Sequence, residues 1–263
     1  MKALQSFRRA HEVAVRRLLM CLSIVLGIVL WKLVSEIPGL GTVIVGPAEV
    51  GAALIKELFH GRLMNDISVS MTRVFSGFGL AFIAALPIAF LMAWYDVVRV
   101  IMEPWLQFFR TIPPIALIPL VIVVAGINES AKIAVIFFCS FLVMVIAIFQ
   151  GVTNVDNVLI KAARTFGAND KDIFLTVVVP ASFPYILVAA RLGISTALTS
   201  LIASEMTGSR AGLGNMIQEA SLYFDMTRVI LGIAVIGTIG LALDKLLLYL
   251  EKKLTAWQEV RRT

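Results

Sequence analysis

The chain has little charge and few residues of the kinds that build metal or disulfide centres. Charged residues make up 15% of its 263 residues, and it contains two cysteines and two histidines. Cys21 and Cys139 both fall inside apolar runs, so they give no indication of the redox compartment. His11 and His60 stand far apart, and each is better explained as a surface residue than as a metal ligand.

The sequence also lacks the short motifs of common catalytic sites. It has no GxxxxGK[ST] phosphate loop, so it does not bind ATP in that manner, and it has no GxSxG or HExxH motif. No clustered pair of carboxylates lies within an apolar run. We therefore expect a chain that is not an enzyme, has no catalytic or metal site, and binds no cofactor itself.

Long apolar runs fill most of the chain. Hydrophobic residues make up 59% of it and the mean hydropathy is +0.93, whereas a soluble domain of this length needs more polar surface. About 20 apolar residues form a helix of about 30 Å, which matches the hydrocarbon core of a bilayer. We predict an all-α polytopic transmembrane helical bundle with six spans, at residues 18–35, 68–94, 104–125, 131–150, 183–204 and 229–250.

The Lys and Arg residues between these spans predict the orientation of the chain. Thirteen of them lie in segments on one side of the predicted bundle and four on the other. We therefore expect an N-terminal tail (1–17), a loop (151–181) and a C-terminal tail (251–263) on the cytoplasmic side of one transmembrane domain (18–250). The first apolar run is long for a signal peptide and lacks a cleavage site. The net charge of +6 lies at segment ends, which does not indicate nucleic-acid binding.

Two further patterns concern packing. The second predicted span carries small residues four positions apart, at Gly77, Ala81, Ala85 and Ala89, which predicts close helix contact within the subunit or across a dimer seam. Apolar residues at helical spacing within 48–66 (Val50, Leu54 and Leu58) predict a helix on the outer membrane face.

Residues 161–180, KAARTFGANDKDIFLTVVVP, form a polar segment between two apolar runs. Ala162 and Ala163 favour a helix and Gly167 breaks it, so we predict a short polar helix within 156–171. The glycine permits a sharp turn or the close approach of another backbone.

This segment resembles the cytoplasmic coupling loop of importer permeases of the ATP-binding-cassette class. The family pattern is Glu-Ala-Ala, three residues, Gly, nine residues, Ile, one residue, Leu-Pro. Ala162, Ala163, Gly167 and Pro180 match it, while Lys161 replaces the leading Glu.

The resemblance implies a coupling role for this loop. In that family, the loop helix docks in a cleft of a separate ATP-hydrolysing subunit, whose motion then passes to the spans. The residues to which the resemblance assigns this contact are Lys161, Ala162, Ala163, Arg164, Gly167, Ala168, Asp170 and Pro180. The alternative interpretation is a solvated loop without a partner.

Three prolines interrupt the third predicted span, in RTIPPIALIP at 110–119. Proline removes a backbone donor and kinks a helix, which is tolerated in a membrane where neighbours or water satisfy the freed carbonyls. Pro113 and Pro114 are therefore candidates for a gate, although prolines are also common in membrane helices without such a role. The string resembles the third span of permeases in the nitrate, sulfonate and taurine branch.

The fifth predicted span is the most polar. Ser195 and Thr199 are four residues apart and Ser200 lies one further on, with Arg191 one turn before Ser195. These hydroxyls either line a solute pathway or make interhelical hydrogen bonds, which contribute about 0.6 kcal/mol each in membranes. A cation in hydrocarbon costs at least about 2.5 kcal/mol, so Arg191 should face the bundle interior or water. We hypothesise that it assists an anionic solute.

Glu205 ends this span, before a segment with glycines at 208, 212 and 214. These glycines allow sharp turns. The resemblance implies that this segment lies at the external end of the pathway, where Glu205 either contacts solute or forms an ion pair with Arg210, and we favour the ion pair.

The resemblance covers residues 20–257. It implies a permease subunit of a nitrate/sulfonate/taurine-type binding-protein-dependent importer, with the type I importer permease fold, in a bacterial inner membrane with both termini cytoplasmic. The implied partners are a dimer of ATPase subunits holding ATP and Mg, a solute-binding protein, a second permease copy and membrane lipid, with a small anion as solute. The rival class is an energy-independent carrier or a scaffold subunit. A carrier should show titratable residues near mid-membrane or repeated broken helices, and neither pattern is evident.

Overall fold

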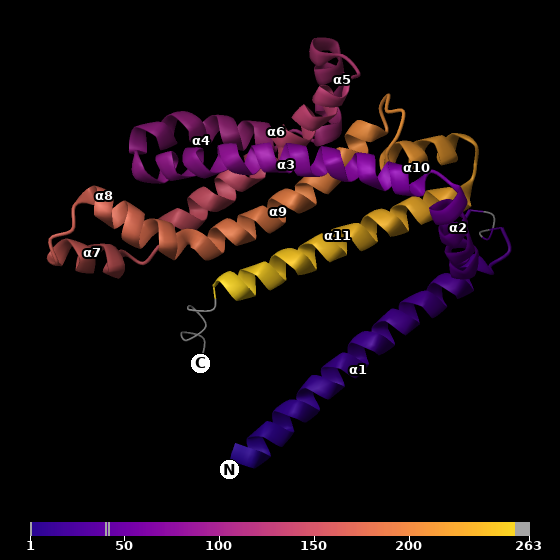
Figure 1. The fold of residues 1–263 in the computed structure, drawn as a ribbon, viewed down its shortest axis with the longest axis horizontal. Helices are drawn as coiled ribbons and strands as arrows, with labels where there is room; N and C mark the ends of the chain where they lie inside the picture. Colours follow the sequence, from indigo (N-terminus) through magenta and orange to yellow (C-terminus); the bar gives the residue numbers. More distant parts are fainter. Residues whose placement is uncertain (1, 40, 42, 256–263) are drawn as a thin grey trace. The chain divides into compact units, whose positions relative to one another are not determined.

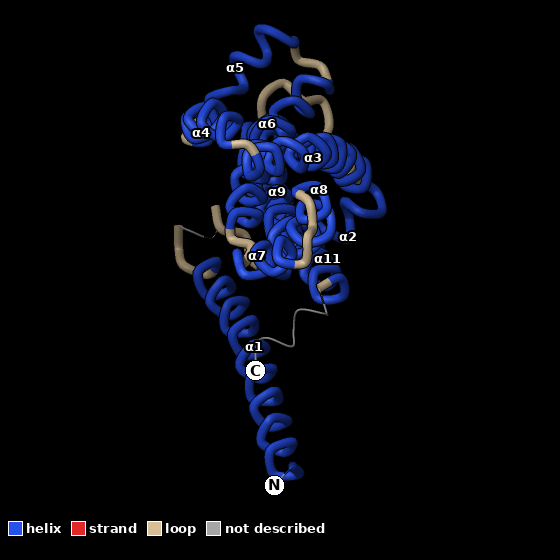
Figure 2. The backbone as a smooth tube through the Cα atoms, turned by 90° about the vertical axis from the view of Figure 1, so that its left-hand side faces the viewer, coloured by secondary structure: helices blue, strands red, loops and turns tan. Residues whose placement is uncertain are grey.

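The computed structural model describes residues 2–39, 41 and 43–255, and the ordered elements in these ranges are all helices (Figures 1 and 2). The chain divides into two compact units, residues 1–62 with 219–231, and residues 63–218 with 232–263. The predicted all-α bundle is therefore confirmed as to its secondary structure. Most of the predicted C-terminal tail (251–263) lies outside the described residues.

The first unit contains α1 (Lys2–Ser35) and α2 (Pro47–His60). Helix α1 includes the predicted span 18–35 and continues through the segment predicted as a tail. The Trp31 indole N–H donates to the Val45 carbonyl at 3.0 Å, which ties the connection back onto α1. Helix α2 begins at Pro47, whose fixed φ and missing N–H suit the first turn of a helix.

The second unit is built around α3 (Leu63–Trp94), α6 (Glu129–Thr153) and α9 (Val179–Glu205), which lie side by side (Figure 1). Its main core gathers buried aliphatic residues of α3 and α6 with residues that flank or belong to α9. Asn128 caps α6 by accepting a hydrogen bond from the Ala131 N–H at 3.0 Å. Helices α10 (Leu213–Leu222) and α11 (Met226–Leu254) complete the described fold.

The small-residue stripe of α3 packs within the subunit. Ala81, Ala85 and Ala89 are fully buried, and a Cβ at Gly77 would lie 2.6 Å from the Ile136 Cγ2 atom of α6. The sequence left open whether this stripe faces the chain's own helices or a second copy. The contact between Gly77 and Ile136 assigns this part of it to the seam between α3 and α6.

The third predicted span is not one straight helix. Residues 104–125 fall on α4 (Asp96–Arg110) and α5 (Pro114–Ala125), which meet at an angle of 101°. The break lies at residues 111–113, because Pro113 and Pro114 cannot supply the backbone donors that a continuous helix needs. Pro113 is the N-cap residue of α5 and Pro114 its first residue, so both begin a helix and do not kink its interior.

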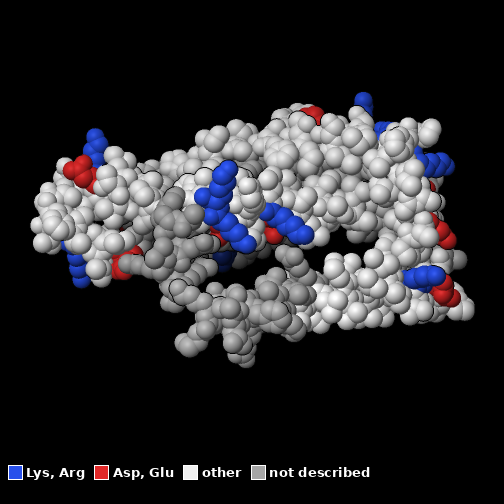
Figure 3. Space-filling view, turned by 60° about the horizontal axis from the view of Figure 1, so that its bottom comes forward, with Lys and Arg blue, Asp and Glu red and all other residues white. Residues whose placement is uncertain are grey.

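Five described helices are long and apolar enough to cross a membrane, and the bent pair of α4 and α5 makes a sixth span only when counted as one. The other five predicted spans therefore each have a helix, at Leu18–Ser35, Leu63–Trp94, Glu129–Thr153, Asp170–Glu205 and Met226–Leu254. Uncharged side chains cover most of the face in Figure 3, with charged residues in small groups. Such a surface suits a lipid environment.

Candidate functional site

The loop predicted to couple the chain to a partner forms α7 (Asn157–Thr165). Asp156 caps this helix by accepting a hydrogen bond from the Val158 N–H at 2.9 Å. The chain turns at Gly167, which has a φ of +84°, a backbone conformation that residues with a Cβ rarely adopt. The predicted helix, and the glycine that ends it, are therefore both present.

Helix α7 presents an open surface. Lys161, Ala162 and Arg164 are exposed, and Ala163 is half-buried against the rest of the unit. Phe166 is 90% exposed and lies in a segment that is otherwise polar. Aromatic residues are enriched in contacts between proteins, so Phe166 is a candidate contact for another chain.

The charges of this loop lie at its edge. The Arg164 guanidinium pairs with the Asp170 carboxylate at 3.3 Å, and both side chains are well exposed. Ala168 is half-buried, and its N–H donates to the Ala163 carbonyl at 3.1 Å, which closes the turn after Gly167. The predicted rim charges thus pair with each other, while Lys161 makes no ion pair within the described chain.

A wide helical turn joins this loop to α9. After the single turn α8 (Asp170–Asp172), residues Ile173–Val178 form the π-helical segment η1, which leads into α9. Pro180 follows directly, and it has no N–H to donate to the carbonyl four residues earlier, a defect that a π-turn can absorb. Figure 1 shows α7 and α8 together at the end of the unit where α6 finishes and α9 starts.

A buried charge network lies at the opposite end of these helices. Arg73 of α3 is 3% exposed and donates from Nη1 to Glu205 Oε1 at 2.6 Å. Its Nε and Nη2 atoms form a two-pronged contact with Glu129 at 2.6 and 2.7 Å. Charge-assisted bonds of this geometry are among the strongest polar contacts. They join the first residues of α6 and the last residue of α9 to α3.

The Glu205 carboxylate is fully surrounded by donors. Ser70 donates to it at 2.8 Å, and the Gly214 N–H donates to its second oxygen at 2.8 Å. The sequence favoured Arg210 as the ion-pair partner of Glu205, whereas the structure places Arg73 of α3, 132 residues away in sequence, against its carboxylate. A Cβ at Gly212 would collide with the Glu205 carboxylate, so the glycine loop folds directly over this group.

Arg191 is also paired. Its guanidinium donates to Asp244 Oδ1 at 2.9 and 3.0 Å and lies 3.5 Å from Glu251. Both partners are on α11, so two carboxylates already hold the guanidinium, and its role toward an anionic solute stays a hypothesis. The guanidinium is about a quarter exposed, consistent with the expectation that it avoids hydrocarbon.

The hydroxyls of α9 bond to their own helix. Ser195, Thr199 and Ser200 each donate to a backbone carbonyl four residues earlier, at 2.8 to 3.1 Å. Ser200 is fully buried, whereas Ser195 and Thr199 are exposed. No hydroxyl of this set makes a hydrogen bond to another helix among the described residues, so the two exposed ones are the better candidates for a pathway.

Comparison with known proteins identifies the family. Residues 77–256 match the model of the binding-protein-dependent transport system inner membrane component. The chain belongs to this family. A probable ABC transporter permease protein of Brucella abortus is 46% identical over 238 residues, covering 90% of this chain and 94% of that protein.

Two further comparisons agree. The taurine transport system permease protein of Escherichia coli is 32% identical over 195 residues, covering 74% of this permease and 71% of that protein. A crystal structure of an amino acid ABC transporter aligns with a TM-score of 0.64 at 19% identity, covering 77% of this chain and 97% of that one. At that identity the likeness shows the fold, and the predicted type I importer permease fold is confirmed.

The sequence reasoning missed the ion pairs of Arg73, Glu129 and Lys132 and the exposure of Phe166. The apolar spacing does not predict that Arg73 and Glu129 pair, or that the Lys132 ammonium lies 3.0 Å from the Glu129 carboxylate. Charged residues inside apolar runs were the available signal, since such residues almost always pair inside a bundle. Phe166 was overlooked because a single aromatic in a polar loop carries no pattern.

Proposed function

We propose that this permease is driven by a separate ATP-hydrolysing subunit that grips α7. The observation that carries the proposal is the exposed Phe166 at the end of a capped helix that projects between α6 and α9. The family is a transport component and not an enzyme, so the energy of import has to come from a partner chain. ATP and Mg are held by that partner and not by the permease.

The proposed contact between α7 and the ATPase subunit is small, and the sizes of the side chains on α7 determine how closely the partner approaches. Ala162 and Gly167 leave room for the partner's surface, Phe166 fills a hydrophobic pocket, and the pair of Arg164 and Asp170 lies at the rim. Rim charges contribute little affinity and act mainly on specificity. Lys161, where the family pattern has Glu, favours an acidic residue on the partner opposite it.

Motion at α7 has a direct route to the bundle. The π-helical η1 connects the loop to α9, and α9 packs along α6. Displacement of α7 therefore moves the start of α9, the helix that carries the exposed hydroxyls at Ser195 and Thr199. This route fits alternating access, in which the pathway opens first to one side of the membrane and then to the other.

The solute is a small anion carrying a sulfonate or similar group. The similarity of this chain to a taurine transport permease supports this class of solute. A solute-binding protein delivers the solute, and a second copy of the permease completes the pathway, because six spans enclose little space. The membrane is a bacterial inner membrane with α7 and both termini on the cytoplasmic side, as the distribution of Lys and Arg favours.

Co-purification tests the coupling proposal. The permease is expressed with a candidate ATPase subunit, and Phe166→Asp is compared with Tyr223→Asp, a control in which a side chain that is 80% exposed on the other unit receives the same charge. We expect Phe166→Asp to lose the ATPase while Tyr223→Asp retains it. Equal recovery of the ATPase with both variants contradicts the proposal.

A further inference from the structure

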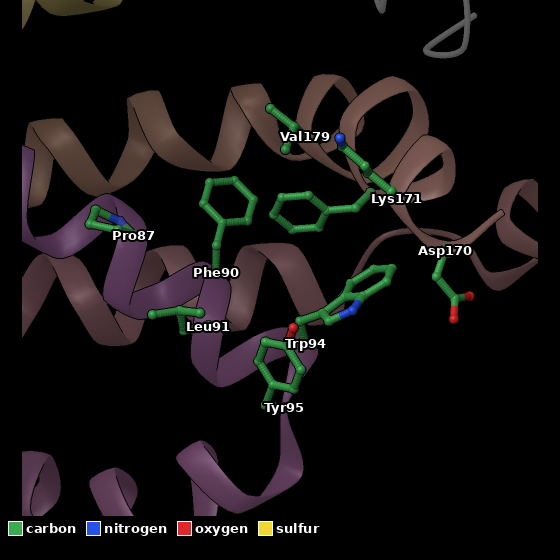
Figure 4. Close-up of a pocket in the computed structure, with 9 residues that line it drawn as sticks. Pro87, Phe90, Leu91, Trp94, Tyr95, Asp170, Lys171 and Val179 are labelled. Atoms are coloured by element: carbon green, nitrogen blue, oxygen red, sulfur yellow. The ribbon is translucent and has the colours of Figure 1, made fainter.

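A cleft of about 770 Å³ lies where α3 ends and the segment leading into α9 begins (Figure 4). Seven of its nine lining residues are apolar or aromatic, and the remaining two are Asp170 and Lys171. Its volume is within the range of about 300–1,000 Å³ that is typical of ligand sites. Of the residues assigned above to the ATPase contact, Asp170 alone lines this cleft.

The walls are aromatic. The Phe174 ring of η1 packs edge-on against two rings of α3, with centroid distances of 5.5 Å to Phe90 and 5.0 Å to Trp94. Trp94 is the last residue of the span α3, and Tyr95 follows it with 54% of its surface exposed. Trp and Tyr at the end of a span mark the interface between hydrocarbon and water. The cleft therefore opens at the level of lipid headgroups.

The charged residues at the cleft differ in whether they form an ion pair. Asp170 pairs with Arg164 at 3.3 Å, and Asp96, next to Tyr95, pairs with Arg99 at 3.1 Å. Lys171 forms no ion pair within the described chain. In Figure 4 the Lys171 side chain extends toward the side of Val179, and the Asp170 carboxylate points away from it. An unpaired ammonium beside an apolar cleft at the interface is complementary to an anionic amphiphile.

We propose that this cleft binds an anionic phospholipid, with part of an acyl chain against Phe90, Leu91 and Phe174 and the phosphate at Lys171. The acyl chain covers apolar surface that water otherwise meets, including Leu91, which is 46% exposed. The ammonium supplies the electrostatic preference for a negative headgroup. Because the cleft borders η1, the lipid lies against the segment that joins α7 to α9. The proposal does not depend on α7 binding an ATPase.

Fluorescence quenching by brominated lipids tests the site. In a permease whose other tryptophans, Trp31, Trp105 and Trp257, are replaced by Phe, Trp94 reports on the cleft. The protein is reconstituted in bilayers of phosphatidylcholine containing either brominated phosphatidylglycerol or brominated phosphatidylcholine at equal mole fraction. We expect phosphatidylglycerol to associate about fivefold more strongly at Trp94.

Three variants complete the test. Lys171→Gln should remove the preference for phosphatidylglycerol, Lys171→Arg should keep it, and Lys161→Gln should keep it because this exposed lysine does not line the cleft. Equal quenching by the two lipids, or a preference that survives in Lys171→Gln, overturns the proposal. Loss of all lipid quenching at Trp94 when the ATPase is bound also overturns it, because a protein then occupies the cleft.

Discussion

Arg73 on α3 and Glu205 at the end of α9 form an ion pair of 2.6 Å whose side chains are 4% and 0% exposed. Glu129 on α6 holds the other edge of the same guanidinium. All three donor nitrogens of Arg73 are engaged, so this residue fastens three helices together at one end and has no donor atom left without a partner.

Replacing Arg73 by Gln should destabilise the permease strongly. Breaking a buried pair from one side leaves an uncompensated charge, which costs about 3–5 kcal/mol. Thermal unfolding of the purified protein in detergent measures the effect. The matched control is Arg99→Gln, whose pair with Asp96 is exposed and contributes about 0–1 kcal/mol. Similar losses of stability in the two variants would show that the Arg73 network stabilises the fold no more than an exposed ion pair does.

Two glycines on α3 should respond oppositely to the same substitution. In Gly77→Ala the new Cβ meets Ile136 at 2.6 Å and the Ile133 carbonyl at 3.1 Å, so we expect a loss of about 1–3 kcal/mol. In Gly79→Ala the Cβ meets nothing within 4 Å, and the better helix propensity of Ala leaves stability unchanged or raised by up to about 1 kcal/mol. Unfolding midpoints measure both, and equal shifts would refute the close packing of α3 against α6.

A substitution at Gly167 should impair coupling through its backbone conformation and not through a packing clash. A Cβ at this position meets nothing within 4 Å, but its φ of +84° strains any other residue by about 1–2 kcal/mol. We expect Gly167→Val to reduce solute-dependent ATP hydrolysis by the assembled transporter while the bundle remains folded. Gly237→Val, a helical position with equal free space, serves as the control. Normal coupling in Gly167→Val would argue against the turn being required.

Arg191 and Asp244 should behave as a structural pair. Arg191→Gln alone leaves Asp244 without its partner between α9 and α11, and we expect a lower unfolding midpoint. The double variant Arg191→Gln with Asp244→Asn should recover most of that loss, because both charges are then removed. Transport assays of the double variant separate the two roles: retained uptake supports a structural pair, and lost uptake in a stable protein supports solute recognition by Arg191.

Local patterns predicted much of this molecule. Apolar length located five spans, Asp156 and Gly167 bounded the loop helix, and the glycines before α10 indicated a tight turn, which Gly208 and Gly212 make at positive φ. These features depend on neighbouring residues, so they are readable from short stretches of sequence.

Long-range partners were not predictable in this way. Glu205 was assigned to Arg210, five residues away, because nothing in one sequence indicates that Arg73 lies beside it in space. The bend between α4 and α5 was likewise read as kinks within one span, since the angle depends on what each half packs against. The pairing of residues across a bundle depends on how the helices pack together. The local patterns of a single sequence do not show that packing.

Photo-cross-linking from α7 in the intact transporter tests the central claim most directly. Benzoylphenylalanine replaces Phe166 in one preparation and Tyr223, on the other unit, in another. The account predicts a cross-link from position 166 to the ATPase and none from position 223. A fully assembled, active transporter in which position 166 cross-links only to lipid or to the solute-binding protein would contradict it.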